Sequence, residues 1–377
     1  MTHDMARDMA VVISSILRSS PVMMTFAICR SGRYRLPALL SVTLATSLAS
    51  LLACPSAGMA ARELPRFVPR PVAAVRPNGH AGSQAHRLRL INAARSWGYQ
   101  LSSLNVAQAA RSPFDLLVID GTTGLAGNRP LTRAQIQSLK RKPDGKRRLV
   151  ISYLSIGEAE DYRTDYFAKE YLTEDAPDWL MAENPHWKGN RIIRFCEEGW
   201  QKTILGDRYG HNVYNSIELS PLDRLIELGF DGVYLDRVDV YSEVGRQCPD
   251  AENRMVDFVA RLASHARRRN SNFIVMLQNA EELLVHAKMR RAIDAVAKED
   301  LFYGNDYSQR RNSADDIANS IQYLKKAKHA GRPVFVVDYV KSRRKIRAAK
   351  RLIKANGFIP YIGPRDLNRL WLPGRNF

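Results

Sequence analysis

Acidic and amide side chains follow most of the apolar, β-rich runs of this sequence, and they are the residues best suited to carry chemistry. They close successive runs, as Asp120, Glu158, Asp236, Gln278 and Asn279, Glu299, and Asp338. A single Asp after a strand is often only the N-cap of the next helix. Because the carboxyl ends of parallel strands meet at one edge of a sheet, we expect these side chains to converge on one site.

The residue types of this group favour acid–base chemistry on a sugar. The sequence has no G-x-S-x-G nucleophile turn and no H-E-x-x-H zinc motif, and no histidine stands at a strand end. Two carboxylates suffice for glycoside hydrolysis, because one attacks or activates water while the other protonates the leaving oxygen. Aromatic residues that either stack on sugar faces or pack in the core are Trp179, Trp187, Trp200, Tyr234, Tyr241 and Tyr303.

These side chains must be positioned by strands that alternate with helices. The β-rich runs are residues 99–101, 114–120, 148–155, 191–195, 232–236, 273–279, 295–299, 334–339 and 358–362. Most are continuously apolar, as in a parallel sheet that is covered on both faces. The alternation predicts an α/β fold, a single (β/α)8 TIM barrel, with one run outside the ring or misread. An open doubly wound sheet is the alternative, weakened because no Gly-rich phosphate-binding turn follows the first strands.

Two long segments resemble the hallmarks of a known family. Residues 152–163, with the sequence SYLSIGEAEDYR, and residues 230–239, with the sequence FDGVYLDRVD, are similar to those of glycoside hydrolase family 114. Its members are the endo-α-1,4-polygalactosaminidase-like proteins. Three shorter matches follow in the family's order, at residues 278–283, 298–303 and 336–339. The resemblance covers roughly residues 97–362.

The resemblance implies a TIM-barrel glycosidase with Asp236 as nucleophile and Glu299 as acid/base, acting on an α-linked, polygalactosamine-like polymer. Retention is the expected outcome and inversion the alternative, since carboxylates ~5 Å apart give retention and carboxylates ~6.5–9.5 Å apart give inversion. The resemblance also implies a substrate subsite lined by Asp120, Tyr153, Ser155, Glu158, Asp239, Asn279, Tyr303, Asp338 and Tyr339. No cofactor and no metal are expected. The sequence departs from the family at residues 197–200, which read EEGW where an Asp-Pro-x-Trp-like stretch is usual. A barrel that binds glycan without cleaving it is the alternative.

Residues before the barrel indicate export. Arg30, Arg33 and Arg35 precede an apolar stretch at residues 36–53, and small residues ending at Ala60 follow, which is the order of a secretory signal. We expect cleavage near Ala60 and a secreted or periplasmic protein. Lipoprotein anchoring at Cys54 is a less favoured alternative, and polar residues in the apolar stretch argue against a stable membrane span. The expected domains are a leader at 1–60, a flexible basic linker at 61–90 and the barrel at 91–377.

Two cysteines remain outside the leader region, Cys196 and Cys248. In an oxidising compartment such a remainder suggests one disulfide. We expect Cys196 to follow a barrel strand at 191–195 and Cys248 to follow the next strand. Neighbouring loops of a barrel share one face, so a bond of normal Cα spacing is feasible. The alternative is two unpaired cysteines.

The chain is strongly basic, with 57 Lys and Arg against 38 Asp and Glu and a net charge of +19. Removing residues 1–60 leaves 52 against 36, or +16. The clusters at 267–269 and 343–345 would support binding to nucleic acid or an anionic envelope, but both lie in helical segments without interleaved aromatics. We therefore expect a polysaccharide as partner, no nucleic acid, a monomer, and an acidic cavity mouth on a basic surface.

Overall fold

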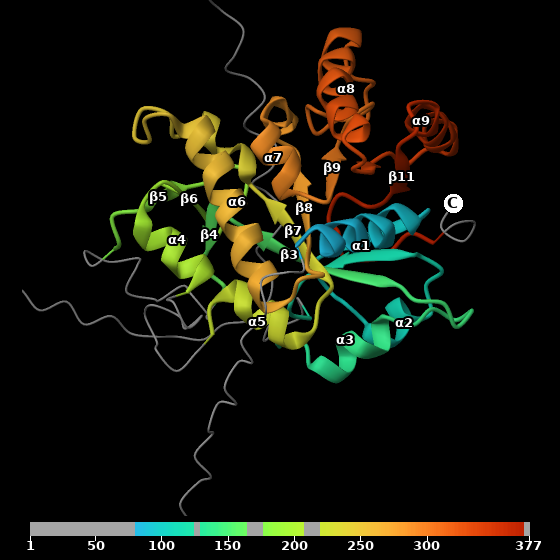
Figure 1. Cartoon of the computed structure of the whole chain (residues 1–377). Helices are drawn as coiled ribbons and strands as arrows, with labels where there is room; N and C mark the ends of the chain where they lie inside the picture. Colours follow the sequence, from blue (N-terminus) through green and yellow to red (C-terminus); the bar gives the residue numbers. More distant parts are fainter. Residues whose placement is uncertain (1–79, 124–128, 164–175, 207–218, 373–377) are drawn as a thin grey trace, which may run out of the picture. The chain divides into compact units, whose positions relative to one another are not determined.

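The computed structural model describes residues 80–123, 129–163, 176–206 and 219–372, and Figure 1 shows them as strands with helices outside. Eight parallel strands form one sheet that is nearly closed into a barrel, and their order in the sheet follows the chain. They are β1 (Trp97–Gln100), β2 (Leu116–Ile119), β3 (Leu149–Ser155), β7 (Gly232–Asp236), β8 (Ile274–Gln278), β9 (Ala295–Glu299), β10 (Val334–Asp338) and β11 (Ile359–Ile362). The predicted (β/α)8 barrel is confirmed.

Aromatic side chains pack where the first and last strands of the barrel approach each other. The ring of Trp97 lies 5.7 Å from those of Phe335 and Tyr361. The indole Nε1 of Trp97 also donates a hydrogen bond of 3.2 Å to the backbone carbonyl of Ile359. A buried Trp usually needs a partner for its N–H, and here that partner ties β1 to β11 across the seam of the sheet.

Helices cover the barrel with apolar stripes that the sequence shows at helical spacing. On α6 (Ala251–Arg269) the residues Met255, Phe258, Val259 and Leu262 are fully buried. The other helices are α1 (His80–Ala93), α2 (Val106–Ala110), α3 (Arg133–Leu139), α4 (Glu198–Leu205), α5 (Pro221–Leu228), α7 (Ala287–Ala292), α8 (Ala314–His329) and α9 (Arg343–Ala355), with 3-10 turns η3 (Val238–Ser242) and η4 (Glu281–Val285). Within the described ranges, no helix is both long and apolar enough to cross a membrane.

The basic cluster at the end of α6 has structural partners. Arg267 forms an ion pair of 2.7 Å with Asp294, and Arg269 forms one of 2.6 Å with Asp223. Both carboxylates are completely buried. Two of the three arginines of this cluster therefore stabilise the barrel, which weakens the case for an anionic partner at this place.

The boundary predicted between linker and barrel, at residue 90, falls inside α1. Arg87 of this helix is almost fully buried, forms an ion pair of 3.0 Å with Asp294 and donates 2.7 Å to the carbonyl of Ser271. Ile91 is completely buried. Residues 80–90 are therefore part of the folded barrel rather than of a linker. The predicted leader and the remainder of the linker lie outside the described residues.

Of the nine predicted β-rich runs, the one at 191–195 lies outside the ring. It forms β6 (Asn190–Ile193), the central strand of a small antiparallel sheet with β4 (Glu158–Glu160) and β5 (Leu180–Glu183). This sheet is an insertion between β3 and β7. The run read as a barrel strand because it is apolar, but β6 is only partly buried.

The structure joins Cys196 and Cys248 in a disulfide with 6.1 Å between their Cα atoms. The predicted position of Cys196 was wrong, because Cys196 follows a strand of the inserted sheet rather than a barrel strand. Cys248 follows β7, as expected. Because β3 and β7 are neighbours in the barrel, the insertion that follows β3 and the loop that follows β7 come together on the same face.

Candidate active site

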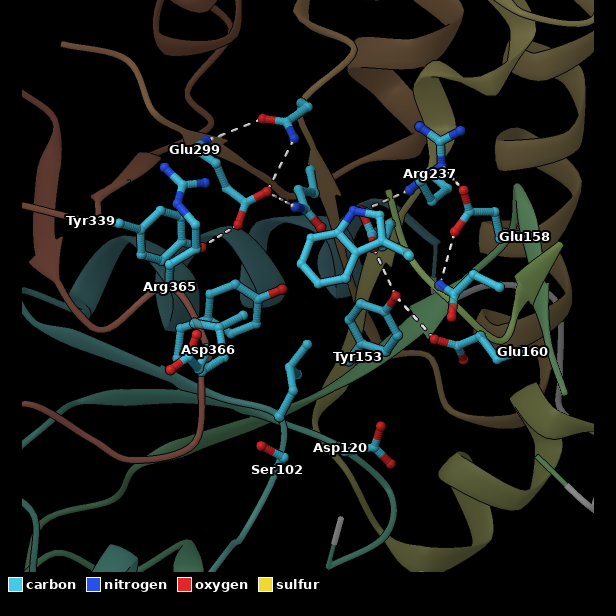
Figure 2. Close-up of a pocket in the computed structure, with 18 of the residues that line it drawn as sticks. Ser102, Asp120, Tyr153, Glu158, Glu160, Arg237, Glu299, Tyr339, Arg365 and Asp366 are labelled. Atoms are coloured by element: carbon cyan, nitrogen blue, oxygen red, sulfur yellow. Dashed lines mark hydrogen bonds and ion pairs between the residues drawn. The ribbon is translucent and has the colours of Figure 1, made fainter. Parts of the chain in front are cut away.

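A cavity of about 790 Å³ lies where the loops after the barrel strands meet (Figure 2). Its volume is within the range of about 300–1,000 Å³ common for ligand sites. Among the described residues it is lined by eight acids and four bases, a balance of −4, although the chain as a whole carries +19. The acids are Asp120, Glu158, Glu160, Asp236, Asp239, Glu299, Asp300 and Asp366, and the bases are Arg163, Arg237, Lys298 and Arg365. This local excess of acid is the charge pattern expected from the sequence.

Asp236 stands at the end of β7 and is held at both carboxylate oxygens. The hydroxyl of Tyr153 donates to Oδ2 at 2.7 Å, and the backbone N–H of Arg237 donates to Oδ1 at 2.8 Å. Burial, followed by the nearby charge of Glu299, raises the pKa of Asp236 to about 7. Burial also raises the pKa of Tyr153, so its hydroxyl remains a donor. Asp236 therefore holds a proton in the resting enzyme below neutral pH.

Glu299 stands at the end of β9 and is surrounded by hydrogen-bond donors. The side-chain amides of Gln278 and Asn279 both donate to Oε2, Asn279 at 3.3 Å. The hydroxyl of Tyr339 donates to Oε1, and burial raises its pKa so that it stays protonated. These donors come from the ends of β8 and β10. The two acids thus have contrasting surroundings, which is the arrangement that separates an acid from a base.

Gln278 is oriented by its contact with Glu299. Its amide nitrogen faces the carboxylate, and its buried oxygen Oε1 has no hydrogen-bond partner among the described residues. Gln278 lines the cavity. An unpaired buried acceptor costs about 1–3 kcal/mol, and a hydroxyl or ammonium group of a bound ligand would satisfy it.

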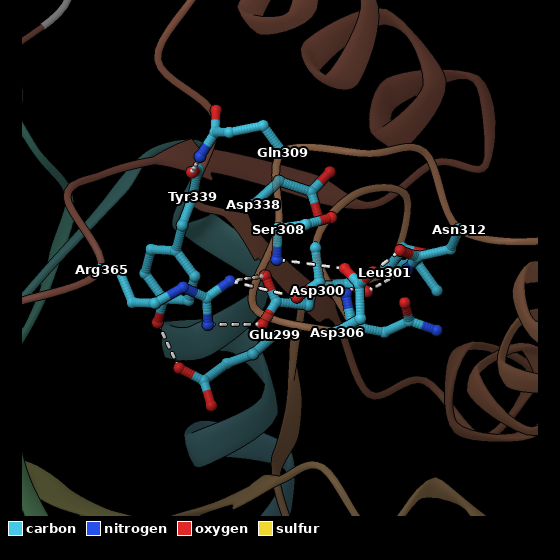
Figure 3. A network of polar contacts seen from close by, with 12 residues as sticks. Glu299, Asp300, Leu301, Asp306, Ser308, Gln309, Asn312, Asp338, Tyr339 and Arg365 are labelled. Carbon is cyan, nitrogen blue, oxygen red and sulfur yellow. Dashed lines mark hydrogen bonds and ion pairs between the residues drawn. The ribbon is translucent and has the colours of Figure 1, made fainter. Parts of the chain in front are cut away.

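Arg365 builds the wall of the cavity beside Glu299 (Figures 2 and 3). Its guanidinium donates to both oxygens of Asp300, at 2.9 and 2.7 Å, and lies 4.6 Å from the ring centre of Tyr339. Burial raises the pKa of Asp300 to about 6 despite this pairing. Arg365 therefore fixes the ring of Tyr339, and through its hydroxyl the carboxylate of Glu299.

On the opposite side of the cavity, Arg163 neutralises two acids. It donates to both oxygens of Asp120, at 2.6 and 3.2 Å, and it pairs with Glu160. Glu160 also accepts a hydrogen bond of 2.7 Å from the hydroxyl of Tyr162. Asp120 lines the cavity as predicted, but its charge is already compensated within the protein.

The carboxylate of Glu158 is bound by other side chains of the protein and is not free to contact a ligand. It is 1% exposed. Asn184 donates to its Oε1 at 2.6 Å, Asn190 to its Oε2 at 2.9 Å, and Arg237 pairs with Oε1 at 2.7 Å. The carboxylate therefore links the inserted sheet to the residue that follows Asp236.

Of the other predicted subsite residues, Asp239, Asn279 and Tyr339 line the cavity, whereas Ser155, Tyr303 and Asp338 do not. Ser155 is buried, and its hydroxyl accepts the backbone N–H of Glu158 at 3.2 Å. Asp338 is fully buried, accepts the backbone N–H of Phe302 at 3.2 Å, and has its pKa raised to about 7 by burial. Tyr303 forms an antiparallel bridge with Arg311 and is also buried. These three are buried within the protein. For Asp338 the neighbour Tyr339 reaches the cavity instead, because successive side chains of an extended chain point to opposite sides.

The aromatic candidates separate in the same way. Trp179, Trp200 and Tyr234 are buried, and the rings of Trp179 and Trp200 lie 4.9 Å apart in the core. Tyr241 is half-buried and does not line the cavity, whereas Trp187 is exposed and does. The stretch 197–200 that departs from the family starts α4, and its Trp packs inside the protein. The departing residues 197–199 are half-buried or exposed, and none of them lines the cavity.

Sequence reasoning missed several lining residues, namely Tyr99, Arg163, Arg237, Tyr307, Arg365 and Asp366. Arg163 and Arg237 stand inside the two hallmark segments and could have been found there. Arg365 follows the last strand in a segment without a motif, so nothing in the pattern marks it. Among the described residues, no group of His, Cys, Asp and Glu has an arrangement that would hold a metal ion.

Comparisons with known proteins agree with this geometry. Residues 79–373 match the profile of glycoside-hydrolase family GH114. The chain is 33% identical over 295 residues to an uncharacterized protein of Methanocaldococcus jannaschii, covering 73% of this chain and 79% of the relative. It is 32% identical to an uncharacterized protein of Deinococcus radiodurans, covering 75% and 84%. The glycoside hydrolase domain of PelA from Pseudomonas aeruginosa shares the fold, with a TM-score of 0.55 and 18% identity over 73% of this chain and 97% of that domain.

Proposed function

This chain belongs to glycoside-hydrolase family GH114, and we propose that it hydrolyses an α-linked polymer of amino sugars resembling polygalactosamine. The observation that carries the proposal is the pair Asp236 and Glu299. Both carboxylates stand at the ends of barrel strands, line one cavity and have contrasting surroundings. Two carboxylates of this kind are what glycoside hydrolysis requires.

In the proposed reaction the ionised carboxylate of Asp236 attacks the anomeric carbon as the glycosidic bond breaks. The leaving oxygen takes a proton from Glu299. Water, deprotonated by Glu299, then attacks the glycosyl-enzyme, which releases Asp236 and retains the anomeric configuration. Tyr153 and the backbone N–H of Arg237 hold the two oxygens of Asp236, so only small rearrangement is needed for attack.

The pair works in the state that holds one proton. The pKa of Asp236 is raised to about 7, so this carboxyl holds a proton below neutral pH, while the carboxylate of Glu299 accepts hydrogen bonds from three donors. A protonated amine on the bound sugar, close to Asp236, would favour the ionised form of that carboxylate. A cationic substrate would therefore help to move the pair toward its reactive arrangement.

The charge of the cavity supports an amino sugar over an acidic one. Eight acids against four bases line it, and Asp239 is 44% exposed at its side chain. A cationic chain is attracted to such a mouth, whereas uronic acids would be repelled. The surrounding basic surface does not oppose this, because fields of exposed charges are screened within about 8–10 Å at physiological salt.

The test is release of reducing ends from de-N-acetylated polygalactosamine, compared with its fully N-acetylated form and with neutral polymers. We expect turnover of the cationic polymer, lost in Asp236→Asn and in Glu299→Gln. Asp257→Asn, on the exposed face of α6, is the matched control and should keep full activity. Binding to the polymer without release of reducing ends would support the alternative, a barrel that only binds glycan.

Export is a separate proposal and rests on the sequence of residues 30–60. A leader cleaved near Ala60 would place the enzyme in the periplasm or outside the cell, where such polymers occur. The N-terminal sequence of protein from the exported fraction tests it, and an uncleaved cytoplasmic chain would contradict it.

A further inference from the structure

Exposed aromatic side chains gather at the mouth of the cavity. Among the described residues, the large hydrophobic side chains that are exposed are Tyr162 at 47%, Trp187 at 51%, Val285 at 47% and Tyr307 at 59%. Every aromatic one of these lines the cavity. Single exposed apolar residues are normal anywhere on a surface, but their concentration at one cavity indicates a binding role.

Trp187 is held in place by contacts of its neighbouring residues with Glu158. It lies between Asn184 and Asn190, and both asparagines donate to the carboxylate of Glu158. The backbone N–H of Trp187 donates to the carbonyl of Asn184 at 3.2 Å, and its own carbonyl accepts from Asn190 at 3.0 Å. The turn that carries the indole is thus anchored on both sides, although the indole itself is half exposed.

Tyr307 is held by the loop that follows β9. Its backbone N–H donates to the carbonyl of Gly304 at 2.9 Å, and the guanidinium of Arg365 lies 5.2 Å from the centre of its ring. Gln309 of the same loop donates to the carbonyl of Tyr339 at 2.8 Å. The loop is therefore tied to the wall beside Glu299.

The two loops meet. The ring of His186, which precedes Trp187, stacks on Tyr307 with 6.1 Å between centroids and 27° between planes. The inserted sheet and the loop after β9, although distant in sequence, therefore present neighbouring aromatic faces at the cavity mouth. Because each loop is fixed by its own hydrogen bonds, little side-chain ordering remains to be lost when a ligand binds.

We propose that Trp187 and Tyr307 form a sugar-binding subsite outside the catalytic pair, which takes pyranose rings of a polymer chain. The C–H face of such a ring packs on an aromatic face, and a protonated amine adds attraction to the ring electrons. This inference rests on the proposed function and deepens it, because a subsite beyond the catalytic pair serves a substrate several residues long. The enzyme would then cleave within chains rather than at single terminal units.

The experiment uses the full chain with Glu299→Gln, so that bound ligand is not consumed. The probes are α-1,4-linked galactosamine oligomers, a trimer and an octamer, measured by calorimetry. We expect Trp187→Ala and Tyr307→Ala each to weaken octamer binding about tenfold, from the apolar area that a sugar would cover. The trimer should lose less, and Trp187→Phe should keep most of the affinity. Tyr323→Ala, a half-buried aromatic on α8 away from the cavity, is the control and should bind as the parent does.

Equal octamer affinity in the parent and both alanine variants would overturn the subsite, as would a parent that binds no oligomer. Steady-state kinetics of variants that keep Glu299 distinguish a failure of the subsite from a failure of the proposed function. Turnover with an unchanged KM in Trp187→Ala would remove the subsite and leave the glycosidase. Binding that depends on Trp187 without any turnover by the wild type would leave the subsite and remove the glycosidase.

Discussion

Replacing Asp236 by Asn should stabilise the fold more at alkaline than at acid pH, while it abolishes activity. The carboxyl of Asp236 has a pKa of about 7 in the folded protein, against 3.8 as the ordinary value. Below about pH 3.8 the carboxyl is protonated in both states, so its raised pKa costs the native state nothing. Between pH 3.8 and about 7 the unfolded chain ionises this group while the folded protein keeps the proton, so stability falls with rising pH, and the loss is complete above about pH 7.

The shift is about three units, or about 4 kcal/mol at about 1.36 kcal/mol per unit. Between about pH 5 and about pH 8 roughly two of these units are crossed, which is about 2.7 kcal/mol. Asp236 opens on the cavity and is only partly buried by the rest of the chain, so water screens part of this cost. We expect the gain in unfolding free energy of Asp236→Asn to grow by about 1.5–2 kcal/mol across this interval.

The assay is urea unfolding of wild type and variant at both pH values, followed by circular dichroism. The hydrogen bonds from Tyr153 and Arg237 change by the same amount at either pH, so the pH-dependent difference isolates the charge. Asp366→Asn is the control, because Asp366 lines the same cavity but is exposed. An identical stability difference at the two pH values would refute the claim that the folded protein raises the pKa of Asp236.

Three further outcomes test the site. The value of kcat/KM should fall as pH rises through about 7, because the pair then loses its last proton and with it the acid, and a plateau to about pH 9 would contradict this. Asp236→Asn and Glu299→Gln should each lower kcat by roughly a thousandfold or more, and azide should give a glycosyl azide of inverted configuration with the first and of retained configuration with the second, as product NMR would show. Glu158→Gln should raise KM about tenfold with less effect on kcat, since it loosens the turn that carries Trp187, and an effect on kcat alone would assign it a different role.

The barrel strands could be predicted because continuous apolar runs in a chain of this size usually form buried strands. The one misplaced run shows the limit of this signal. Residues 191–193 are apolar enough to read as a barrel strand, but their partners are β4 and β5, and pairing is a long-range property. A local pattern shows that a segment is a strand but not which strand it pairs with. The inserted sheet was therefore not recognised, although the barrel was.

The site was predictable to the resolution of strand ends and no further. Both members of the proposed catalytic pair, Asp236 and Glu299, end strands, and both line the cavity. Asp338 also ends a strand, yet its neighbour Tyr339 reaches the cavity in its place. The direction of a side chain at the last residue of a strand depends on where the pleat ends, which the pattern does not state. Arg365 was beyond reach for another reason, since its partners Asp300 and Tyr339 lie in other elements.

The hallmark segment after β3 is long because it meets three separate demands within a few residues. Tyr153 reaches Asp236, Glu158 anchors the inserted sheet, and Arg163 compensates Asp120. Gly157 makes this spacing possible, because a Cβ there would lie 2.0 Å from the carbonyl oxygen of Arg237. The backbone N–H of Ile156 meanwhile donates to the carbonyl of Asp236 at 3.0 Å. The close backbone approach of the two hallmark segments therefore sets the position of Asp236, and no other residue at 157 would allow it without moving Arg237.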